Sequence, residues 1–405
     1  MVWNDRMTGR KAVSRRTALV GSIVVSVALL AVTVVSGESE GPGSPATGAD
    51  AADSGLEPIE LRYLAVLPPI NRSGRAIPAE EIRQRLALRL GLLRGIDVLD
   101  HDKLDRFMRR HRMRFTGGLN SELARLLDVE TNSWGVLITS VDLYSDETNP
   151  ALALTCRLVT TEAEPRILWM DSAVRTGDQS PGAFDLGLVS DPAVIVDDVA
   201  SQVVMSLPRG EGGPEDSPKR KRAKIRKFKP RVFYSSPDLS VIRREDARIV
   251  VLPFTNDSGS NYVGEIVSDQ LVRQLVALDV AVIEPGVVRQ ALLEARQVYP
   301  EGPSIPETDI LRASLNADVV VYGEVENYKE QGPINAEPYV EFLVHAMDAE
   351  RGQVIWSSAS YGGGNKGVFF FGLGHVPTAH QLASRMVAAL IWAVDRADQS
   401  NRKRR

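Results

Sequence analysis

The sequence contains one ten-residue pattern twice. Ala65–Gly74 aligns with Val250–Gly259, and Leu-Pro-x-x-Asn-x-Ser-Gly is identical in both segments. Self-similarity at a fixed spacing is typical of chains that repeat one structural unit. Any fold expected for one half of the chain therefore has to be the fold of the other half as well.

Further matches follow in the same order and at nearly the same offset. Ile96–Asp100 aligns with Val280–Glu284, and Ile167–Trp169 aligns with Val354–Trp356. One such match is weak evidence, but a collinear series over most of a domain's length is strong. The series predicts two tandem copies of one domain.

Both copies have the same expected order of elements. Early apolar strands alternate with helices, and later strands alternate apolar and polar residues, so that Leu154, Cys156 and Leu158 share one strand face. This order predicts an α/β fold in which a mixed sheet carries flanking helices. We assign the first, diverged copy to residues 59–207 and the second copy to residues 247–397.

The N-terminus has the charge pattern of a membrane-spanning segment. Residues 1–16 carry five basic side chains and one acid, and an uncharged run, Thr17–Val35, follows. A helix of this length spans about 29 Å, close to the hydrocarbon thickness of a bilayer. Basic residues before the run and acidic residues after it place the N-terminus inside. We therefore expect a cytoplasmic basic segment at residues 1–16, a transmembrane signal anchor at residues 17–35 and a flexible tether at residues 36–58.

This assignment leaves alternatives open. The run also fits a signal peptide that is cleaved before Gly37, and Ser14–Arg16 resembles a twin-arginine export signal. No cysteine follows the run directly, which excludes a lipoprotein anchor. We expect a single-pass protein of the cytoplasmic (inner) membrane, with its C-terminal domains on the extracytoplasmic, periplasmic side. Export after signal cleavage is the alternative.

The segment between the copies, residues 208–246, is basic, as is the tail at residues 398–405. Most of the basic residues of residues 208–246 lie between positions 219 and 231. This basic run fits either a solvated linker or a contact for anionic lipid headgroups or an anionic wall polymer. Because it lies in the exported part of the chain, we expect no nucleic acid partner. The nine basic residues between positions 219 and 231 are Lys219, Arg220, Lys221, Arg222, Lys224, Arg226, Lys227, Lys229 and Arg231.

The repeated Asn-x-Ser-Gly segment has two interpretations. Asn71 with Ser73, and Asn256 with Ser258, have the spacing of the glycosylation sequon of an exported chain. Asparagine and serine side chains also bond to the backbone of turns and cap helices. Because both pairs occupy the same place in the repeat, we predict a structural turn.

The sequence lacks the usual motifs of catalytic, cofactor and metal sites. A single cysteine excludes a disulfide framework and any zinc site with two or more thiolates. His375 and His380 are five residues apart, which is not the i, i+4 spacing of metal ligands on a helix. The glycine-rich segment Gly362–Gly367 lacks the Gly-Lys-Ser/Thr ending of a phosphate loop. We therefore predict no catalytic residue, no cofactor and no metal, and hence a protein that is not an enzyme.

Three consecutive phenylalanines, Phe369, Phe370 and Phe371, form the most apolar stretch in a region that otherwise resembles a loop. If they are exposed, they mark a binding patch. If they are buried, they seat the last helix. They are our candidate contact for a partner protein.

Three segments of the second copy carry a resemblance to a known family. Ile249–Phe254 with Asn256 and Ser258, then Ala317–Gly323, then Asp348–Ser357 resemble the amino-terminal domain of TolB and CsgG-like domains. That superfamily includes the curli secretion lipoprotein and lipoprotein activators of penicillin-binding proteins. The resemblance implies a location in a bacterial envelope and the binding of another protein.

The first copy resembles the family less closely. It has Trp134 and Gly135 where the second copy has Ala317 and Asp318. The gap in the second hairpin, Lys329–Pro338, is too short for two membrane-crossing strands, so we do not expect a pore.

The resulting hypothesis is a membrane-anchored, non-enzymatic envelope protein. It would bind another envelope protein and assist assembly, transport or wall synthesis. The alternative is a binding module that takes an anionic ligand or envelope polymer on its basic linker.

Overall fold

The computed structural model describes seven stretches of the chain, and residues 59–405 form one compact unit. We refer to residues 62–208 as the first half and to residues 226–404 as the second half. None of the helices in the described stretches is long and apolar enough to cross a membrane. The anchor expected at residues 17–35 lies outside them. The described residues are 62–179, 188–208, 226–244, 246–296, 303–330, 337–365 and 375–404.

The first half is built on a mixed sheet with the strand order β3-β1-β4-β5-β6, and β2 pairs with β4. Strand β1 runs parallel to β3 and β4, whereas β4, β5 and β6 are antiparallel. The elements are β1 (Tyr63–Val66), β2 (Ile70–Asn71), α1 (Ala79–Gly91), β3 (Asp97–Val98), α2 (His101–Arg110), α3 (Ser121–Thr131), β4 (Ser133–Ser145), β5 (Ala151–Thr160), β6 (Ile167–Thr176) and α4 (Pro192–Met205).

The second half has a sheet of the order β10-β8-β11-β12-β13-β7, and β9 pairs with β11. Apart from β7, order and direction match those of the first sheet. The elements are the 3₁₀ helix η2 (Arg226–Phe228), β7 (Val232–Ser235), the 3₁₀ helix η3 (Pro237–Arg243), β8 (Arg248–Val251), β9 (Thr255–Asn256), α6 (Val263–Val276), β10 (Ala281–Val282), α7 (Pro285–Glu294), α8 (Ile305–Leu315), β11 (Val319–Lys329), β12 (Tyr339–Asp348), β13 (Gln353–Gly363) and α9 (Ala379–Arg404). The prediction of an α/β fold with mixed sheets and flanking helices is confirmed.

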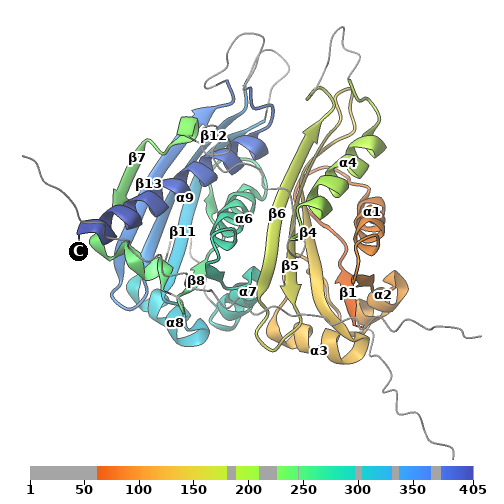
Figure 1. Ribbon diagram of the computed structural model, residues 1–405, viewed down its shortest axis with the longest axis horizontal. Helices are drawn as coiled ribbons and strands as arrows, with labels where there is room; N and C mark the ends of the chain where they lie inside the picture. Colours follow the sequence, from red (N-terminus) through yellow and green to blue (C-terminus); the bar gives the residue numbers. More distant parts are fainter. Residues whose placement is uncertain are drawn as a thin grey trace, which may run out of the picture. The chain divides into compact units, whose positions relative to one another are not determined.

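In each half the first and the last helix cover one face of the sheet (Figure 1). Helices α1 and α4 bury Leu86 and Val199 against Leu154 of the first sheet. Helices α6 and α9 do the same in the second half, with Leu271 against Phe342. Helices α2 and α3, and likewise α7 and α8, cover only part of the opposite face. Most of that opposite face is therefore left to other elements of the chain or to solvent.

Local backbone features recur at matching positions of the two halves. Strand β4 has a bulge at Asp142 and strand β11 has one at Glu326, where the pairing register shifts by one residue. Helix α3 ends at Asn132 and helix α8 at Asn316, both in the left-handed conformation with φ of 57° and 52°. Asparagine tolerates this conformation better than most residues, so it ends a helix well.

Two segments outside the expected domain boundaries are folded onto the second half. Strand β7, from the segment we assigned to the linker, pairs with β13 and extends the second sheet. Helix α9 continues through the segment we assigned to the basic tail, because Asp398 is buried and Asn401 donates a hydrogen bond to the carbonyl of Ser236. The second half is therefore larger than the repeat alone predicts.

Candidate functional site

Helices of the second half cover the remaining opposite face of the first sheet. Helix α6 lies against β6, and Met170 of β6 joins the hydrophobic core of the second half. The contact is otherwise strongly polar, and two buried arginine–carboxylate pairs lie in it.

The first of these pairs joins Arg157 of β5 to Glu284 at the start of α7. The guanidinium Nε and Nη2 each donate to the carboxylate at 3.0 Å, and Glu284 is fully buried. The backbone N–H of Leu119 donates to the same carboxylate at 3.2 Å. Although burial lowers it, the charges of Glu284 and Asp269 raise the pKa of Arg157 above its usual value.

The second pair joins Arg72 to Asp269 of α6, with Nη1 and Oδ2 2.6 Å apart. Asp142 contacts residues of both halves. Its carboxylate is 3.8 Å from Arg72 of the first half and 3.2 Å from Nε2 of His380 of the second half. Burial opposes ionisation of Asp142, but His380 and Arg72 hold the pKa of this carboxyl below its usual value. Thr155 also donates a hydrogen bond to it at 2.5 Å.

Helix α6 extends this network along the first sheet. Gln270, fully buried, has its Nε2 within 3.4 Å of Thr155 Oγ1 and 3.3 Å of Ser172 Oγ. Arg273 pairs with Asp171 of β6 at 3.0 Å. Gln270, His380 and Glu284 of the second half thus bond to polar side chains of this sheet face, and Arg273 reaches Asp171 on the edge strand β6.

The halves also approach closely through glycines. A Cβ on Gly286 of α7 would lie 2.3 Å from the backbone nitrogen of Leu119, and one on Gly118 would lie 2.7 Å from the Cα of Gly286. No side chain fits at this distance, so the contact requires glycine on both sides.

Beyond the part that α7 and α8 cover, no described helix lies on the matching face of the second sheet. Strand pairing defines eight matching positions on the two sheets. In the first sheet six of the eight are buried, whereas in the second sheet none is. The first set is Ser140, Asp142, Ala153, Thr155, Arg157, Met170, Ser172 and Val174. The second set is Glu324, Glu326, Glu341, Leu343, His345, Ser357, Ala359 and Tyr361.

Strand β7 enlarges this open face. Tyr234 lies opposite Ser357, and Val232 lies opposite Ala359, so both side chains share the face. They are 54% and 62% exposed, and Tyr361 is 42% exposed. We call the eight positions of the second sheet, together with Tyr322, Val232 and Tyr234, the open face.

Aromatic and acidic side chains make up most of the open face. The Tyr322 ring stacks on His345 with centroids 5.3 Å apart. Burial, followed by the charge of Glu341, raises the pKa of Glu326 above its usual value. Burial lowers the pKa of His345. This face therefore offers apolar and aromatic contact area beside crowded acids.

The predicted turns have the same geometry in both halves. The Oδ1 atom of Asn71 accepts from the N–H and the hydroxyl of Ser73 at 3.0 and 2.8 Å. The same bonds join Asn256 and Ser258 at 3.1 and 2.6 Å. Each asparagine also donates to a carbonyl four residues later, at 2.6 Å.

The fold brings the two turns together. Both border one pocket of about 340 Å³, which Arg72, Asp142, Tyr328 and Glu330 also line. Burial raises the pKa of Glu330. Because the cation in this pocket, Arg72, is already paired with Asp269, the pocket offers no free positive charge to an anion.

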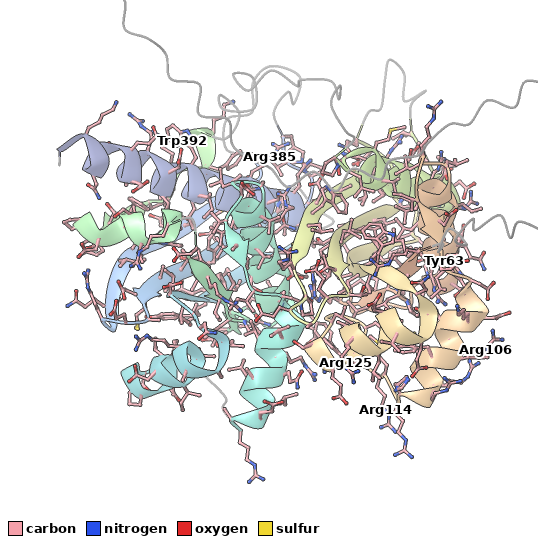
Figure 2. The ribbon with its side chains drawn as sticks, turned by 60° about the horizontal axis from the view of Figure 1, so that its bottom comes forward. Tyr63, Arg106, Arg114, Arg125, Arg385 and Trp392 are labelled. Atoms are coloured by element: carbon pink, nitrogen blue, oxygen red, sulfur yellow. The ribbon has the colours of Figure 1, made fainter. Side chains whose placement is uncertain are left out.

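Of the nine basic residues between positions 219 and 231, the side chains of Lys227, Lys229 and Arg231 are described. Lys229 lies over the ring of Trp392 on α9, which Figure 2 labels, with Nζ 5.5 Å from the ring centre. Arg231 lies over Tyr361 at 5.1 Å, at the margin of the open face. The other six basic residues of the run, and Phe369, Phe370 and Phe371, lie outside the described side chains.

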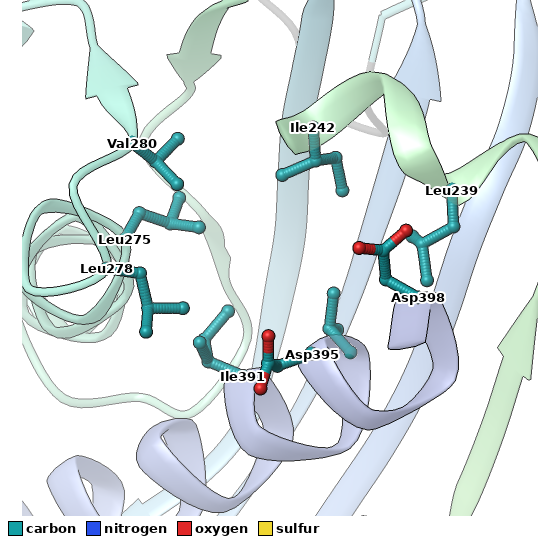
Figure 3. Close-up of a pocket in the computed structure, with 9 residues that line it drawn as sticks. Leu239, Ile242, Leu275, Leu278, Val280, Ile391, Asp395 and Asp398 are labelled. Carbon is teal, nitrogen blue, oxygen red and sulfur yellow. The ribbon is translucent and has the colours of Figure 1, made fainter. Parts of the chain in front are cut away.

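No group of three or more metal-ligating side chains occurs within the described stretches. Cys156 is buried on the same strand face as Leu154 and Leu158, and burial raises the pKa of its thiol to about 12. Figure 3 shows an apolar pocket between α6, α9 and η3, lined by Leu239, Leu275 and Ile391 among others. It measures about 20 Å³, room for about one water molecule, and so holds no ligand of useful size.

Sequence reasoning missed a second basic surface, at α2 and α3 of the first half (Figure 2). Its arginines are exposed, and several border an open pocket of about 480 Å³. The signal was present as six cationic or histidine side chains between residues 106 and 114. We call this surface the arginine cluster: Arg106, Arg109, Arg110, Arg112, Arg114 and Arg125.

No protein-family model and no curated protein matches the sequence. The resemblance to CsgG-like and TolB domains therefore stays a prediction. Solved structures do show similarity. A PelC dodecamer from Paraburkholderia phytofirmans is 18% identical, with a TM-score of 0.28, and the match covers 40% of this chain and 94% of that one.

Two further similar structures are lipoproteins or parts of them. Lipoprotein GNA1162 from Neisseria meningitidis is 18% identical with a TM-score of 0.25, and the match covers 29% of this chain and 80% of that one. The C-terminal domain of LpoB from Escherichia coli is 14% identical with a TM-score of 0.22, over 31% of this chain and 93% of that one.

Proposed function

We propose that this chain is a non-catalytic, membrane-anchored protein of the cell envelope and that its folded part binds protein. The observation that carries the proposal is the open face. At matching positions the first sheet is covered by helices of the second half, whereas the second sheet has exposed Val232, Tyr234 and Tyr361. Contiguous exposed apolar and aromatic side chains are typical of protein contacts.

The envelope location rests on the sequence. The uncharged run at residues 17–35 follows a basic segment, so the folded part would stand outside the cytoplasmic membrane. The tether at residues 36–58 would let it reach a partner.

We also infer that the halves are tandem copies of one domain. The collinear sequence matches, the shared strand order, the two bulges and the two identical turns support this. Duplication explains why each sheet has a matching face. In the first sheet helices of the second half cover this face, and in the second sheet it is the open face.

Photo-crosslinking in the native membrane tests the proposal. A benzophenone amino acid replaces Leu343 of the open face, and a control replaces Val129 of α3, which is 71% exposed. We expect protein adducts from position 343 and none from position 129. If position 343 gives no protein adduct while the chain is folded and in the membrane, the proposal is wrong.

The arginine cluster favours a second candidate function, the binding of an anionic ligand or lipid surface. Here the contact lies on α2 and α3 rather than on the linker. Vesicles with anionic lipid should bind the full chain in low salt, and changing Arg109, Arg112 and Arg114 to Gln should abolish this. The same change in Lys229 and Arg231 serves as the control. Equal losses from both variants would contradict the role of the cluster.

A further inference from the structure

The contact between the halves joins two different surfaces. The first half contributes a sheet face, and the second half contributes the outer side of α6 with part of α9. Contacts of this head-to-tail kind do not close on themselves, and they repeat until a ring closes or a filament grows.

One surface of each kind is left uncovered by the described part of the chain. The open face of the second sheet matches the sheet face that is covered in the first half. The outer side of α1 matches the covering side of α6. At the offset that aligns the two turns, Gln84, Arg85 and Leu88 stand where Asp269, Gln270 and Arg273 stand. We call these three residues of α1 the outer helix face.

Exposure separates the two helices as clearly as it separates the two sheets. Leu88 is 67% exposed and Gln84 is also exposed. Their counterparts in α6 are covered, because Asp269 is buried and Arg273 pairs with Asp171 of β6. An exposed leucine at the place of a covered arginine makes the outer helix face more apolar than the surface it matches.

The residues that would meet are given by the existing contact. Gln270 reaches Thr155 and Ser172 within the chain. Arg85 is the counterpart of Gln270. On the open face, Leu343 is the counterpart of Thr155 and Ala359 is the counterpart of Ser172. An aliphatic pair thus replaces a hydroxyl pair, as expected for a contact between separate molecules that gains from apolar burial.

Charges at the two unused surfaces are also complementary. Glu324, Glu326 and Glu341 crowd the open face. Arg85 and Arg89 of α1 lie 3.5 and 2.5 Å from Asp197, with which they share one carboxylate. Arg85 also lies 3.7 Å from Glu81, but its side chain stays 42% exposed and can reach the glutamates of a second copy.

We propose that the open face binds the outer helix face of a second copy of this chain, so that the protein assembles head to tail. This proposal rests on the proposed function, since it names the partner that docks on the open face. Each junction between chains repeats the junction between halves.

Two variants of the full chain, purified in detergent, test the proposal. One carries Leu343→Arg and Ala359→Arg, which block the open face. The other carries Arg85→Glu and Leu88→Glu, which block the outer helix face. Sedimentation velocity measures their size, and thermal unfolding at the wild-type temperature shows that these surface changes leave the fold intact.

We expect the wild type to form concentration-dependent multimers and each variant to be monomeric, with Kd raised at least tenfold. An equimolar mixture of the variants should form a complex of two chains and nothing larger, because one intact surface of each kind remains. If the helix-face variant alone dimerises, the open faces bind each other and the proposal fails. A monomeric wild type also overturns it.

The two proposals fail separately. Crosslinks from position 343 to a different protein, with none to a second copy, would support docking on the open face and contradict self-assembly. Variants that unfold would be replaced by the single changes Ala359→Lys and Leu88→Lys. An equimolar mixture of these two variants should again form a complex of two chains and nothing larger.

Discussion

The two halves share their strand order, bulges, helix ends and turns, but they differ in what lies on one sheet face. In the first half this face is buried and its polar side chains are satisfied, as Arg157 is by Glu284. In the second half His345 occupies the place of Arg157, and it is only partly buried, with no helix of the chain paired to it as α7 is to Arg157 in the described residues. One fold thus presents the same face as a buried internal junction in one half and as an exposed surface in the other, and the side chains on it differ accordingly.

The largest expected difference between the halves concerns their helix caps. Glu284 and Asp100 both precede a helix and accept from its backbone, but only Glu284 is buried against an arginine of the other half. Glu284→Gln should cost about 3–5 kcal/mol, because it leaves Arg157 buried without its main counter-charge. Asp100→Asn should cost less than about 1 kcal/mol, since asparagine caps equally well. Urea unfolding measures both, and equal losses would contradict the distinction.

The glycine contact gives the next largest effect. Gly286→Ala should destabilise the chain by about 1–3 kcal/mol, because the added Cβ meets the backbone of Leu119, which cannot move aside cheaply. Gly91→Ala, at the end of α1, meets nothing within 4 Å and should be neutral or stabilise by about 0.5–1 kcal/mol. Thermal unfolding of the two variants compares them. A stabilising Gly286→Ala would mean that the halves are not in close contact.

The turns are the feature that should not distinguish the halves. Asn71→Ala and Asn256→Ala each remove the same set of side-chain hydrogen bonds at an exposed site. Each should cost about 1 kcal/mol, and the two losses should agree within about 0.5 kcal/mol. A much larger loss at one turn, measured by the same unfolding assay, would break the match between the halves.

The two bulge acids should respond to acid in opposite directions. Because the pKa of Asp142 is below its usual 3.8, its stabilising contribution is complete above pH 3.8 and is lost as the pH falls further. Because the pKa of Glu326 is raised above its usual 4.5, its contribution becomes more favourable as the pH falls through the raised value.

Unfolding of Asp142→Asn and Glu326→Gln between pH 3 and pH 7 separates the two effects. The first variant should lose less stability on acidification than the wild type, and the second should lose slightly more. These are the smallest effects that we predict, since Glu326 is exposed and solvent screens its charge. Equal pH profiles for both variants would show that the two bulges have the same surroundings.

The sequence predicted the elements of each half because local periodicity and short turn patterns determine them. The alternation of Leu154, Cys156 and Leu158 identifies a strand without reference to the rest of the chain. It did not predict β7, because Val232–Ser235 becomes a strand only through pairing with β13, which lies far along the chain. Val232–Ser235 therefore lies within the segment assigned to the linker and yet pairs with the second sheet.

The candidate site was also beyond local patterns. Ser172, half-buried in the structure, and Ala359 look alike as residues of an exposed strand face, and nothing near either of them in the sequence tells which one a helix will cover. The pairing of Arg157 with Glu284 spans 127 residues and joins the two halves. The phenylalanines chosen from the sequence lie outside the described residues, whereas the open face comes from the comparison of the halves.

Covalent trapping tests head-to-tail docking of the open face most directly. The full chain with Arg85→Cys and Leu343→Cys is treated in the membrane with a short bifunctional thiol reagent, and Cys156 does not react because it is buried and its pKa is about 12. Our account predicts a ladder of dimers, trimers and larger species for the double variant, and monomers for either single variant. Monomers from the double variant, or dimers from Leu343→Cys alone, would contradict it.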